Sequence, residues 1–355
     1  MAAKKKYETL RSEIIAHIKK HGLKQHDQLP TVRELIANFN YSYATVHRTL
    51  IEMQNEGIIT KRHGKGLYVN RVPSATMNNK SVALIIPKDF SAHRIMLDIL
   101  SGVRLALEKA KISMLVSISN MSHEKEQETV DKLLAKHVDG MIIFMEDHYK
   151  DDYSHIQRLK EKNYPFVLID RYIPELETDY VIINNVDAMG RVCSYLRYNR
   201  SCDEIVFVPS NDSSIAASSS DEKLLGYRRA IQMLYGKSDS TVITDEELVD
   251  KIDALCSKYK NLGVCLNHDT MIPDLHKKLA IAGKRVPANC HIFGYNNSYE
   301  TPFYPTVEQF NDQVGRKAAE ILIAKLKDPN RPIEQIRLEA KLILPNGNGD
   351  YSMED

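Results

Sequence analysis

The sequence predicts an α/β fold in two parts, a winged helix-turn-helix domain over residues 1–72 and a two-lobed parallel α/β domain over residues 80–345. Three observations predict it. Two short helical patterns and a hairpin pattern fill residues 29–69, and from Ser81 onward short apolar runs alternate with helical segments. Between them, residues 73–79 are small and polar, as in a linker. Strands that alternate with helices indicate parallel sheets covered on both faces.

The N-terminal part begins with two predicted helices. Residues 7–20 form the first, because apolar side chains recur there at helical spacing. The second begins at Thr31, since Thr31 and Glu34 have the spacing of a capping box, which satisfies the free amides at a helix start. The apolar stripe of this second helix consists of Val32, Leu35, Ile36 and Phe39.

A third helix follows after a short turn. Ser42 is placed to cap it and Gly57 to end it, while Val46, Leu50 and Met53 bury its inner side. Recognition helices contact base edges and phosphates through the side chains of their first turns. The helix residues predicted to contact DNA are Arg33, Ser42, Tyr43, Thr45, His47 and Arg48.

The hairpin after the third helix is predicted to be the wing. Its strands are residues 58–62 and 66–70, and its tip is His63-Gly64-Lys65. Glycine allows the sharp turn, and the two basic side chains are expected to reach phosphate or a neighbouring minor groove. His63, Gly64 and Lys65 therefore complete the predicted DNA-binding set.

Charge is distributed unevenly along the chain. Residues 1–72 contain 13 Lys and Arg against 6 Asp and Glu, a net charge of +7, whereas the whole chain carries +1, which leaves −6 for the rest. A basic N-terminal domain on an acidic remainder favours a polyanion as the partner of that domain alone. The alternative is that the helix-turn-helix docks a protein rather than DNA.

This N-terminal stretch resembles the DNA-binding domain of the GntR family of bacterial repressors. The family pattern LP-S/T-x-R-x-L, S-R-x-T-V-x-x-A-L, E-G-x-I and a G-x-G wing is matched by Leu29–Leu35, Ser42 with Thr45-Val46 and Leu50, Glu56–Ile59, and Gly64-Lys65-Gly66. Tyr43 and His47 stand where the family usually has arginine. The resemblance therefore implies DNA binding with an altered base preference, in which Arg33 and Arg48 carry more of the contact.

The sequence also argues against several other classes of function. The five cysteines form no CxxC motif and no metal-ligand spacing, no apolar run reaches membrane-spanning length, and no signal-peptide pattern opens the chain. We therefore expect a cytoplasmic protein with no metal and no cofactor. The sequence has no GxGxxG, P-loop, GxSxG or HExxH motif, and Ser218-Ser219-Ser220 has the composition of an exposed polar loop. We expect no enzymatic activity.

The C-terminal part has a regular order of strands and helices. The predicted strands are Val82–Ile86, Met114–Ile118, Gly140–Phe144, Phe166–Ile169, Tyr180–Ile183, Glu204–Val208, Leu262–Leu266 and His291–Gly294. The predicted helices are Ile95–Lys109, Glu124–Lys136, Asp187–Tyr198, Lys223–Tyr235, Asp245–Tyr259, Met271–Ala282 and residues 311–326. This number of strands exceeds one open sheet, which indicates two lobes. Residues 346–355 are expected to be a loose tail.

Ligands of parallel sheets bind beyond the carboxyl ends of the strands, and in a two-lobed domain they bind between the lobes. A sugar needs carboxylates, amides and a cationic donor around its edge and an aromatic ring against a face. Polar or aromatic residues stand at such strand ends and at one helix start. The predicted effector-binding residues are Asp89, Phe90, Asp170, Arg171, Lys223, His268, Asp269 and Asn296.

Residues 80–345 resemble the effector domain of the LacI family of repressors, which is similar to periplasmic sugar-binding proteins. The resemblance is carried by Val138–Ile143, Val167–Arg171, Gly226-Tyr227, Asn267-His268-Asp269, Phe293–Asn297 and Thr306–Gln309. It implies that Asp170, Lys223, Asn296 and the turn at Asn267 bind effector. Lys223 replaces the family's usual arginine and Asn296 its usual aspartate, so a different hydroxyl pattern is expected.

A GntR-type domain joined to a LacI-type domain is similar to the arrangement of arabinose-responsive repressors. The resemblance implies a homodimeric repressor of carbohydrate-utilisation genes that reads a palindromic double-stranded DNA operator and releases it when a monosaccharide or sugar derivative binds. A purine effector is the alternative, with Phe90, Tyr227 and Tyr295 as candidate stacking residues.

Overall fold

The computed structural model describes residues 2–55, 57–62, 66–70, 80–87, 94–146, 152–210, 218–298, 304–345 and 351–353. The chain divides into two compact units, Met1–Asn79 and Lys80–Asp355. The predicted linker, residues 73–79, lies outside the described residues. Among the helices that the structure describes, none is both long enough and apolar enough to cross a bilayer.

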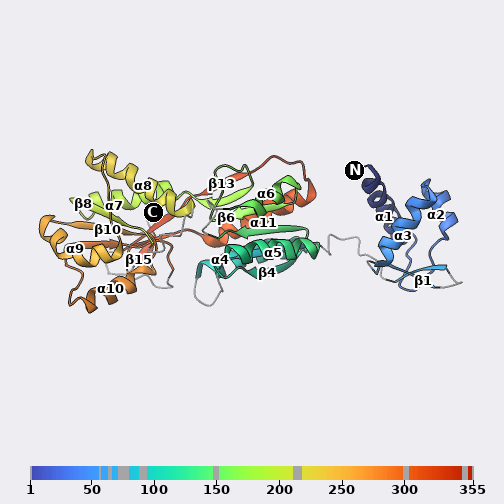
Figure 1. The fold of residues 1–355 in the computed structure, drawn as a ribbon, viewed down its shortest axis with the longest axis horizontal. Coiled ribbons are helices and arrows are strands. Elements are labelled where there is room, and N and C mark those ends of the chain that lie inside the picture. The colour runs from blue at the N-terminus through green and yellow to red at the C-terminus, as the bar shows by residue number, and fades with distance from the viewer. Residues whose placement is uncertain are drawn as a thin grey trace. The chain divides into compact units, whose positions relative to one another are not determined.

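The N-terminal unit is a winged helix-turn-helix, as the sequence predicts (Figure 1). Its elements are α1 (Ala2–Lys20), α2 (Val32–Phe39), α3 (Tyr43–Asn55), β1 (Ile59–Arg62) and β2 (Gly66–Val69). The strands pair in antiparallel register, with Ile59 opposite Val69 and Arg62 opposite Gly66. An isolated bridge from Gln28 to Tyr68 adds the segment before α2 to this hairpin.

Local sequence signals explain where the helices of this unit begin and end. Thr31 and Glu34 form the reciprocal capping box at the start of α2, and Asn40 ends that helix in the left-handed region with a φ of 54°. The amide of Thr45 donates to the hydroxyl of Ser42, which caps α3. The core of the unit consists of Leu10, Ile14, Ile18, Leu29, Leu35, Val46, Leu50, Met53, Ile58, Ile59, Leu67 and Val69.

The first lobe of the C-terminal unit is built on a parallel sheet with the strand order β13-β7-β6-β5-β3-β4. These strands are β3 (Ser81–Ile86), β4 (Ser113–Ile118), β5 (Gly140–Phe144), β6 (Phe166–Ile169), β7 (Tyr180–Ile183) and β13 (Gln335–Leu338). One face packs against α4 (Arg94–Lys109) and α11 (Asn311–Lys327), and the other against α5 (His123–Ala135) and α6 (Ser154–Glu161). Helices on both faces explain why the inner strands β3, β5, β6 and β7 are almost entirely apolar.

The second lobe repeats this architecture on a smaller scale. Its parallel sheet has the order β11-β10-β8-β9, with β8 (Glu204–Val208), β9 (Thr241–Val242), β10 (Leu262–Leu266) and β11 (Cys290–Phe293). The helices are α7 (Asn185–Tyr198) and α8 (Ser218–Tyr235) on one face and α9 (Asp245–Lys258) and α10 (Met271–Ile281) on the other. Figure 1 shows the two lobes side by side along the C-terminal unit.

A small antiparallel sheet of β12 (Thr306–Glu308), β14 (Lys341–Pro345) and β15 (Tyr351–Met353) completes the unit. The prediction of a loose tail is wrong for β15, because Ser352 pairs with Leu344 in this sheet. The predicted strands and helices of the two lobes are otherwise confirmed in kind and order, but the helix predicted from Lys223 begins at Ser218. The sequence analysis did not anticipate α6, β9 and the strands from β12 onward.

Two glycines let α4 and α11 approach each other closely in the first lobe. A Cβ atom at Gly102 would lie 1.9 Å from the carbonyl oxygen of Asp312, and one at Gly315 would lie 2.3 Å from that of Ile99. Backbone atoms have no rotamer with which to move away. Any side chain at either position would therefore separate the two helices.

We expect Gly102→Ala to lower the free energy of unfolding of the C-terminal unit by more than about 2 kcal/mol, because an added methyl group would displace backbone. Urea denaturation followed by circular dichroism measures it. Gly190→Ala in α7 is the matched control, since a Cβ there meets nothing within 4 Å. That variant should gain about 0.5–1 kcal/mol from helix propensity. Equal stabilities for the two variants would contradict the close helix packing.

Candidate functional site

The outer surface of α3 presents the side chains predicted to contact DNA. Tyr43 is 62% exposed, and its ring stacks on that of His47 with a centroid separation of 5.5 Å. The guanidinium group of Arg48 lies over the ring of Tyr7 at 4.5 Å, and its Nε is 3.3 Å from Glu52 Oε1. These contacts hold exposed side chains in defined directions before any nucleic acid is present.

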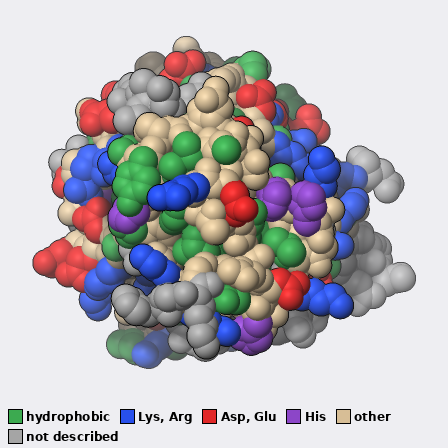
Figure 2. Space-filling model, turned by 90° about the vertical axis from the view of Figure 1, so that its right-hand side faces the viewer, with side chains coloured by type: hydrophobic (Ala, Val, Ile, Leu, Met, Phe, Trp, Pro, Cys, Tyr) green, Lys and Arg blue, Asp and Glu red, His purple; other side chains and the backbone are tan. Residues whose placement is uncertain are grey.

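The remaining helix residues of the predicted set have different positions. Arg33 is exposed on α2, whereas Thr45 is half-buried and its hydroxyl is 2.9 Å from that of Ser42. Ser42 and Thr45 lie at the N-terminus of α3, where free amides and the helix dipole favour a phosphate group. Figure 2 shows basic, acidic and histidine side chains interspersed with hydrophobic and uncharged ones over the face that it views.

The described part of the wing adds two exposed basic side chains, Lys61 and Arg62. The guanidinium group of Arg62 lies 4.5 Å from the centroid of the Tyr68 ring, so the two strands hold it in place. The predicted tip residues His63, Gly64 and Lys65 lie outside the described residues.

A cavity of about 180 Å³ lies at the carboxyl ends of the strands, and both lobes line it. The first lobe contributes residues that end or directly follow its strands β3, β5 and β6, together with the start of α4. The second lobe contributes the start of α8 and the turns after β10 and β11. The lining residues are Pro87, Ile95, Met96, Met121, Phe144, Asp170, Arg171, Ser210, Ser219, Ser220, Lys223, Asn267, His268, Thr270, Asn296, Ser298 and Gln309.

Lys223 is the most deeply buried charged group of this cavity. Its Nζ donates to the carbonyl oxygen of Asn267 at 2.9 Å and to Oδ1 of Asn296 at 3.3 Å, and it lies 4.1 Å from the centroid of the Tyr295 ring. Burial lowers the pKa of Lys223 to about 8, although the nearby charges of Asp170 and Asp269 oppose that shift. Because both acceptors are neutral oxygens, the positive charge of Lys223 can still interact with a polar group of a ligand.

Asp170 and Arg171 face Lys223 from the first lobe. Asp170 follows β6 with a φ of 63°, in the left-handed region that Asp tolerates better than most residues. Its carboxylate is 3.5 Å from Nε of Arg171, and Nη1 of Arg171 donates to the carbonyl oxygen of Met145 at 2.5 Å. The Arg171 guanidinium group also lies 5.0 Å from the centroid of the Phe144 ring.

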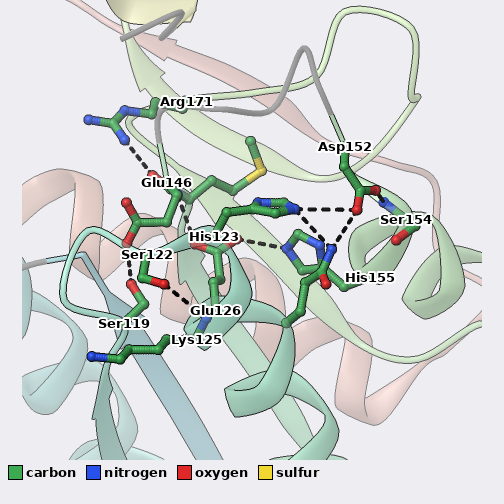
Figure 3. A network of polar contacts seen from close by, with 12 residues as sticks. Ser119, Ser122, His123, Lys125, Glu126, Glu146, Asp152, Ser154, His155 and Arg171 are labelled. Atoms are coloured by element: carbon green, nitrogen blue, oxygen red, sulfur yellow. Dashed lines mark hydrogen bonds and ion pairs between the residues drawn. The ribbon is translucent and has the colours of Figure 1, made fainter. Parts of the chain in front are cut away.

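A network of buried hydrogen bonds holds the backbone segment to which Arg171 is bonded (Figure 3). The amide of Glu146 donates to Glu126 Oε2 at 2.7 Å, and His155 Nε2 is 2.7 Å from Glu126 Oε1. The hydroxyl of Ser119 donates to the carboxylate of Glu146. This network fixes the backbone that carries the Met145 carbonyl, and therefore the direction of Arg171.

The turns after β10 and β11 supply the amide groups of the cavity. Nδ2 of Asn267 donates to Ser220 Oγ at 3.3 Å, while its buried Oδ1 has no partner within the described residues. Asn296 adopts a φ of 90°, and His268 Nδ1 is 2.6 Å from Thr270 Oγ1. An orphaned buried acceptor in the cavity wall is a position where a ligand hydroxyl group would be stabilised.

Asp269 does not line the cavity. Its carboxylate accepts the Ser298 amide and the Thr306 hydroxyl, both at 2.8 Å, and its own amide donates to Tyr295. Burial raises the pKa of Asp269 to about 6, against the opposing hydrogen bonds. Asp269 thus holds the turn behind the cavity, and its charge lies close enough to act on Lys223.

Two aromatic residues proposed to stack on a ligand are instead core residues. Tyr227 and Tyr295 are fully buried and do not line the cavity. The Tyr227 hydroxyl donates to backbone carbonyls at 2.8–2.9 Å, and that of Tyr295 is 3.0 Å from Asn185 Oδ1. Among the described lining residues, the aromatic rings are the phenyl ring of Phe144 and the imidazole ring of His268. Asp89 and Phe90 lie outside the part of the chain that the structure describes.

Two different protein-family models match the two units of the chain. Residues 6–69 match the model of bacterial regulatory proteins of the gntR family, and residues 198–344 match the model of a periplasmic binding protein-like domain. The chain thus joins a gntR-type helix-turn-helix domain to a periplasmic-binding-protein-like domain. The helix-turn-helix of the gntR-type domain and the two-lobed sheets of the second domain agree with these assignments.

Proteins to which this chain is similar are transcription regulators. The arabinose metabolism transcriptional repressor of Halalkalibacterium halodurans is 21% identical, and the alignment covers 98% of both chains. A putative ribose operon repressor from Burkholderia thailandensis has a similar structure, with a TM-score of 0.63, 18% identity, and coverage of 74% of this chain and 98% of that one. A LacI family regulator from Enterococcus faecalis with bound ribose has a TM-score of 0.59, 20% identity, and coverage of 75% and 97%.

The cavity brings together five residues predicted from the sequence: Asp170, Arg171, Lys223, His268 and Asn296. Sequence reasoning missed Phe144 and Pro87, although both stand at strand ends, because only polar and charged residues were sought there apart from Phe90. It also placed Ser219 and Ser220 in a polar loop. The structure corrects this, because α8 begins at Ser218 and both serines line the cavity.

The lowered pKa of Lys223 predicts how stability depends on pH. Because its folded-state pKa is about 8 and its ordinary value is 10.5, the stabilising contribution is present above the ordinary value and is lost as pH falls through 8. Relative to Lys223→Met, the wild-type protein should therefore lose on the order of 3 kcal/mol of unfolding free energy between pH 10 and pH 7. Urea denaturation of both proteins at several pH values measures it. A difference that does not change with pH would contradict the burial of the charge.

Proposed function

We propose that this transcription regulator represses carbohydrate-utilisation genes and is controlled by a small, neutral sugar that binds between the lobes of its second domain. One observation carries the proposal. Asp170 and Arg171 of the first lobe and Lys223 of the second converge on one cavity, which also contains the orphaned amide oxygen of Asn267. A relative that aligns over nearly the whole chain is a repressor of arabinose metabolism.

The chemistry of the cavity fits a sugar. Carboxylate, guanidinium, ammonium and amide groups can all exchange hydrogen bonds with hydroxyl groups, and Phe144, Met96 and Ile95 offer apolar surface to a ring face. The charges of Asp170 and Arg171 cancel, as do those of Lys223 and Asp269 at neutral pH. A neutral ligand therefore disturbs the balance less than a sugar acid or a sugar phosphate would.

A purine effector has less support. Purine pockets need a flat aromatic partner, and the two tyrosines considered for that role have their hydroxyl groups bound within the core. Phe144 remains available, but the Arg171 guanidinium group already lies over its ring.

The sugar is expected to weaken operator binding by a factor of about 5 to 150, the usual range of allosteric coupling. A duplex selected from a random pool by the full-length protein serves as the DNA probe. Thermal shifts with L-arabinose, D-ribose, D-xylose, a sugar phosphate and hypoxanthine identify the effector class. Fluorescence anisotropy then measures DNA affinity with and without the sugar that binds. Tighter DNA binding in its presence would reverse the proposed direction of control.

Variants of the gntR-type domain separate the two activities. Arg33→Ala with Arg48→Ala should reduce DNA affinity at least about 100-fold, because both exposed guanidinium groups are assigned to DNA contacts. The sugar-induced thermal shift should stay as in the wild type. Retained DNA affinity would contradict the assignment of Arg33 and Arg48 to the DNA contact.

We place this protein in the cytoplasm, where operator DNA lies, and expect it to act as a homodimer on a palindromic operator. Exposed apolar side chains at one edge of the first lobe support the dimer. Leu97 and Leu105 on α4 are 51% and 47% exposed, and Leu115 and Val116 on the neighbouring strand β4 are 42% and 39% exposed. β4 is an edge strand of its sheet, and exposed apolar edge strands are surfaces at which a second chain packs.

Leu115→Lys should convert the dimer to a monomer in light scattering after size exclusion, because a charge would enter the apolar contact. Met233→Lys on α8 is the control, since Met233 is 85% exposed but lies on the other lobe. A dimer that survives Leu115→Lys would place the interface elsewhere.

A further inference from the structure

The first turns of α8 bind residues of the opposite lobe through side chains that do not line the cavity. The carboxylate oxygen Oε1 of Glu222 accepts the hydroxyl of Tyr172 at 3.0 Å and Nη1 of Arg337 at 2.6 Å. The amide of Tyr172 donates to Ser218 Oγ, also at 3.0 Å. Glu222 and Ser218 belong to α8 of the second lobe, whereas Tyr172 packs on the core of the first lobe and Arg337 lies in its strand β13.

These contacts are partly buried, and Glu222 is the more protected partner. The side chain of Glu222 is 8% exposed and that of Arg337 is 35% exposed. The Arg337 guanidinium group lies 5.2 Å from the centroid of the Tyr172 ring, which in turn lies 5.0 Å from that of Tyr180. A charge-assisted hydrogen bond at a protected position is stronger than an exposed ion pair.

Each side of this contact is adjacent in sequence to a residue of the cavity. Tyr172 follows Arg171, and Glu222 precedes Lys223. A ligand that bonds to Arg171 and Lys223 therefore draws together the same two backbone segments that Tyr172 and Glu222 already join. The distance between the two halves of the cavity depends on this contact.

We infer that Glu222, Tyr172 and Arg337 form an inter-lobe clamp that positions Arg171 and Lys223 for the effector. The identity of the ligand in this inference rests on the proposed function. The effect of the clamp on the two lobes, in contrast, requires no ligand. Breaking it lets the halves of the cavity separate, so that the effector binds more weakly and lobe movement is no longer coupled to it.

Glu204 provides a matched control within one lobe. Its carboxylate also accepts one cation and one hydroxyl group, from Lys237 at 2.5 Å and Thr241 at 3.3 Å, and its side chain is 6% exposed. Lys237 and Thr241 lie in the second lobe with Glu204 itself. Glu222→Gln and Glu204→Gln thus make the same chemical change in similar surroundings, and only the first affects a contact between lobes.

The test compares both variants in the full-length protein. Glu222→Gln should raise the Kd for L-arabinose or D-ribose, whichever stabilises the wild type more, by about tenfold, the loss expected when a hydrogen bond to a charged group is weakened. Glu204→Gln should leave that Kd within about twofold. Both variants should lose thermal stability, so a drop in Tm alone does not distinguish them. Equal Kd values for Glu222→Gln and the wild type would overturn the clamp.

Hydrogen exchange provides a readout that needs no ligand. The Tyr172 amide, which donates to Ser218, should exchange faster in Glu222→Gln and at the wild-type rate in Glu204→Gln. Tyr172→Phe removes one hydroxyl group and keeps the ring, so it should show the same acceleration even if Glu222→Gln does not fold. If neither sugar stabilises the wild type, the proposed effector is wrong while the exchange experiment still decides the clamp. Unchanged exchange in both clamp variants would overturn it.

Discussion

A buried ammonium group is the constraint on which the C-terminal domain depends. Burying a charge without compensation is costly, so Lys223 requires acceptors at fixed positions. It finds them in the Asn267 carbonyl and the Asn296 side chain. The amide of Asn267 is bound to Val208, and Asn296 holds a left-handed backbone. The turns at the ends of two strands are thus shaped around one cation, and these same turns form the wall of the cavity.

The two lobes share one continuous apolar cluster, and hydrogen bonds from Glu222 and Ser218 join them as well. Glycines permit close helix contacts in both lobes, because a Cβ at Gly226 would lie 2.4 Å from the Val186 carbonyl just as one at Gly102 would meet Asp312. Closely packed helices transmit movement without deforming. Hydrogen bonds between lobes, in contrast, are directional and can be exchanged for bonds to a ligand. A rigid lobe on each side of an exchangeable contact is an arrangement suited to population shift.

The fold followed from the sequence because alternating apolar runs and helical segments are local signals. The cavity could be predicted from the sequence in part, because Asp170 directly follows a strand and Lys223 lies near the start of a helix, and such positions converge in this fold. Other features depend on contacts distant in the sequence. Whether Asp269 faces the cavity or the turn behind it depends on a hydrogen bond to Thr306, and no periodicity encodes that choice. The pairing of Glu222 with Arg337 joins positions 115 residues apart, which becomes visible only in three dimensions.

The order in which the strands appear along the chain has a consequence for biosynthesis. The first lobe receives α11 and β13 only after the whole second lobe has been translated, because β13 pairs with β7 across more than 150 positions. On the ribosome, the helix-turn-helix emerges complete while the partner edge of β7 stays unpaired. Nascent chains would therefore carry a complete helix-turn-helix before they carry a complete C-terminal unit. The open edge during that interval is also the stretch where a chaperone would be needed most.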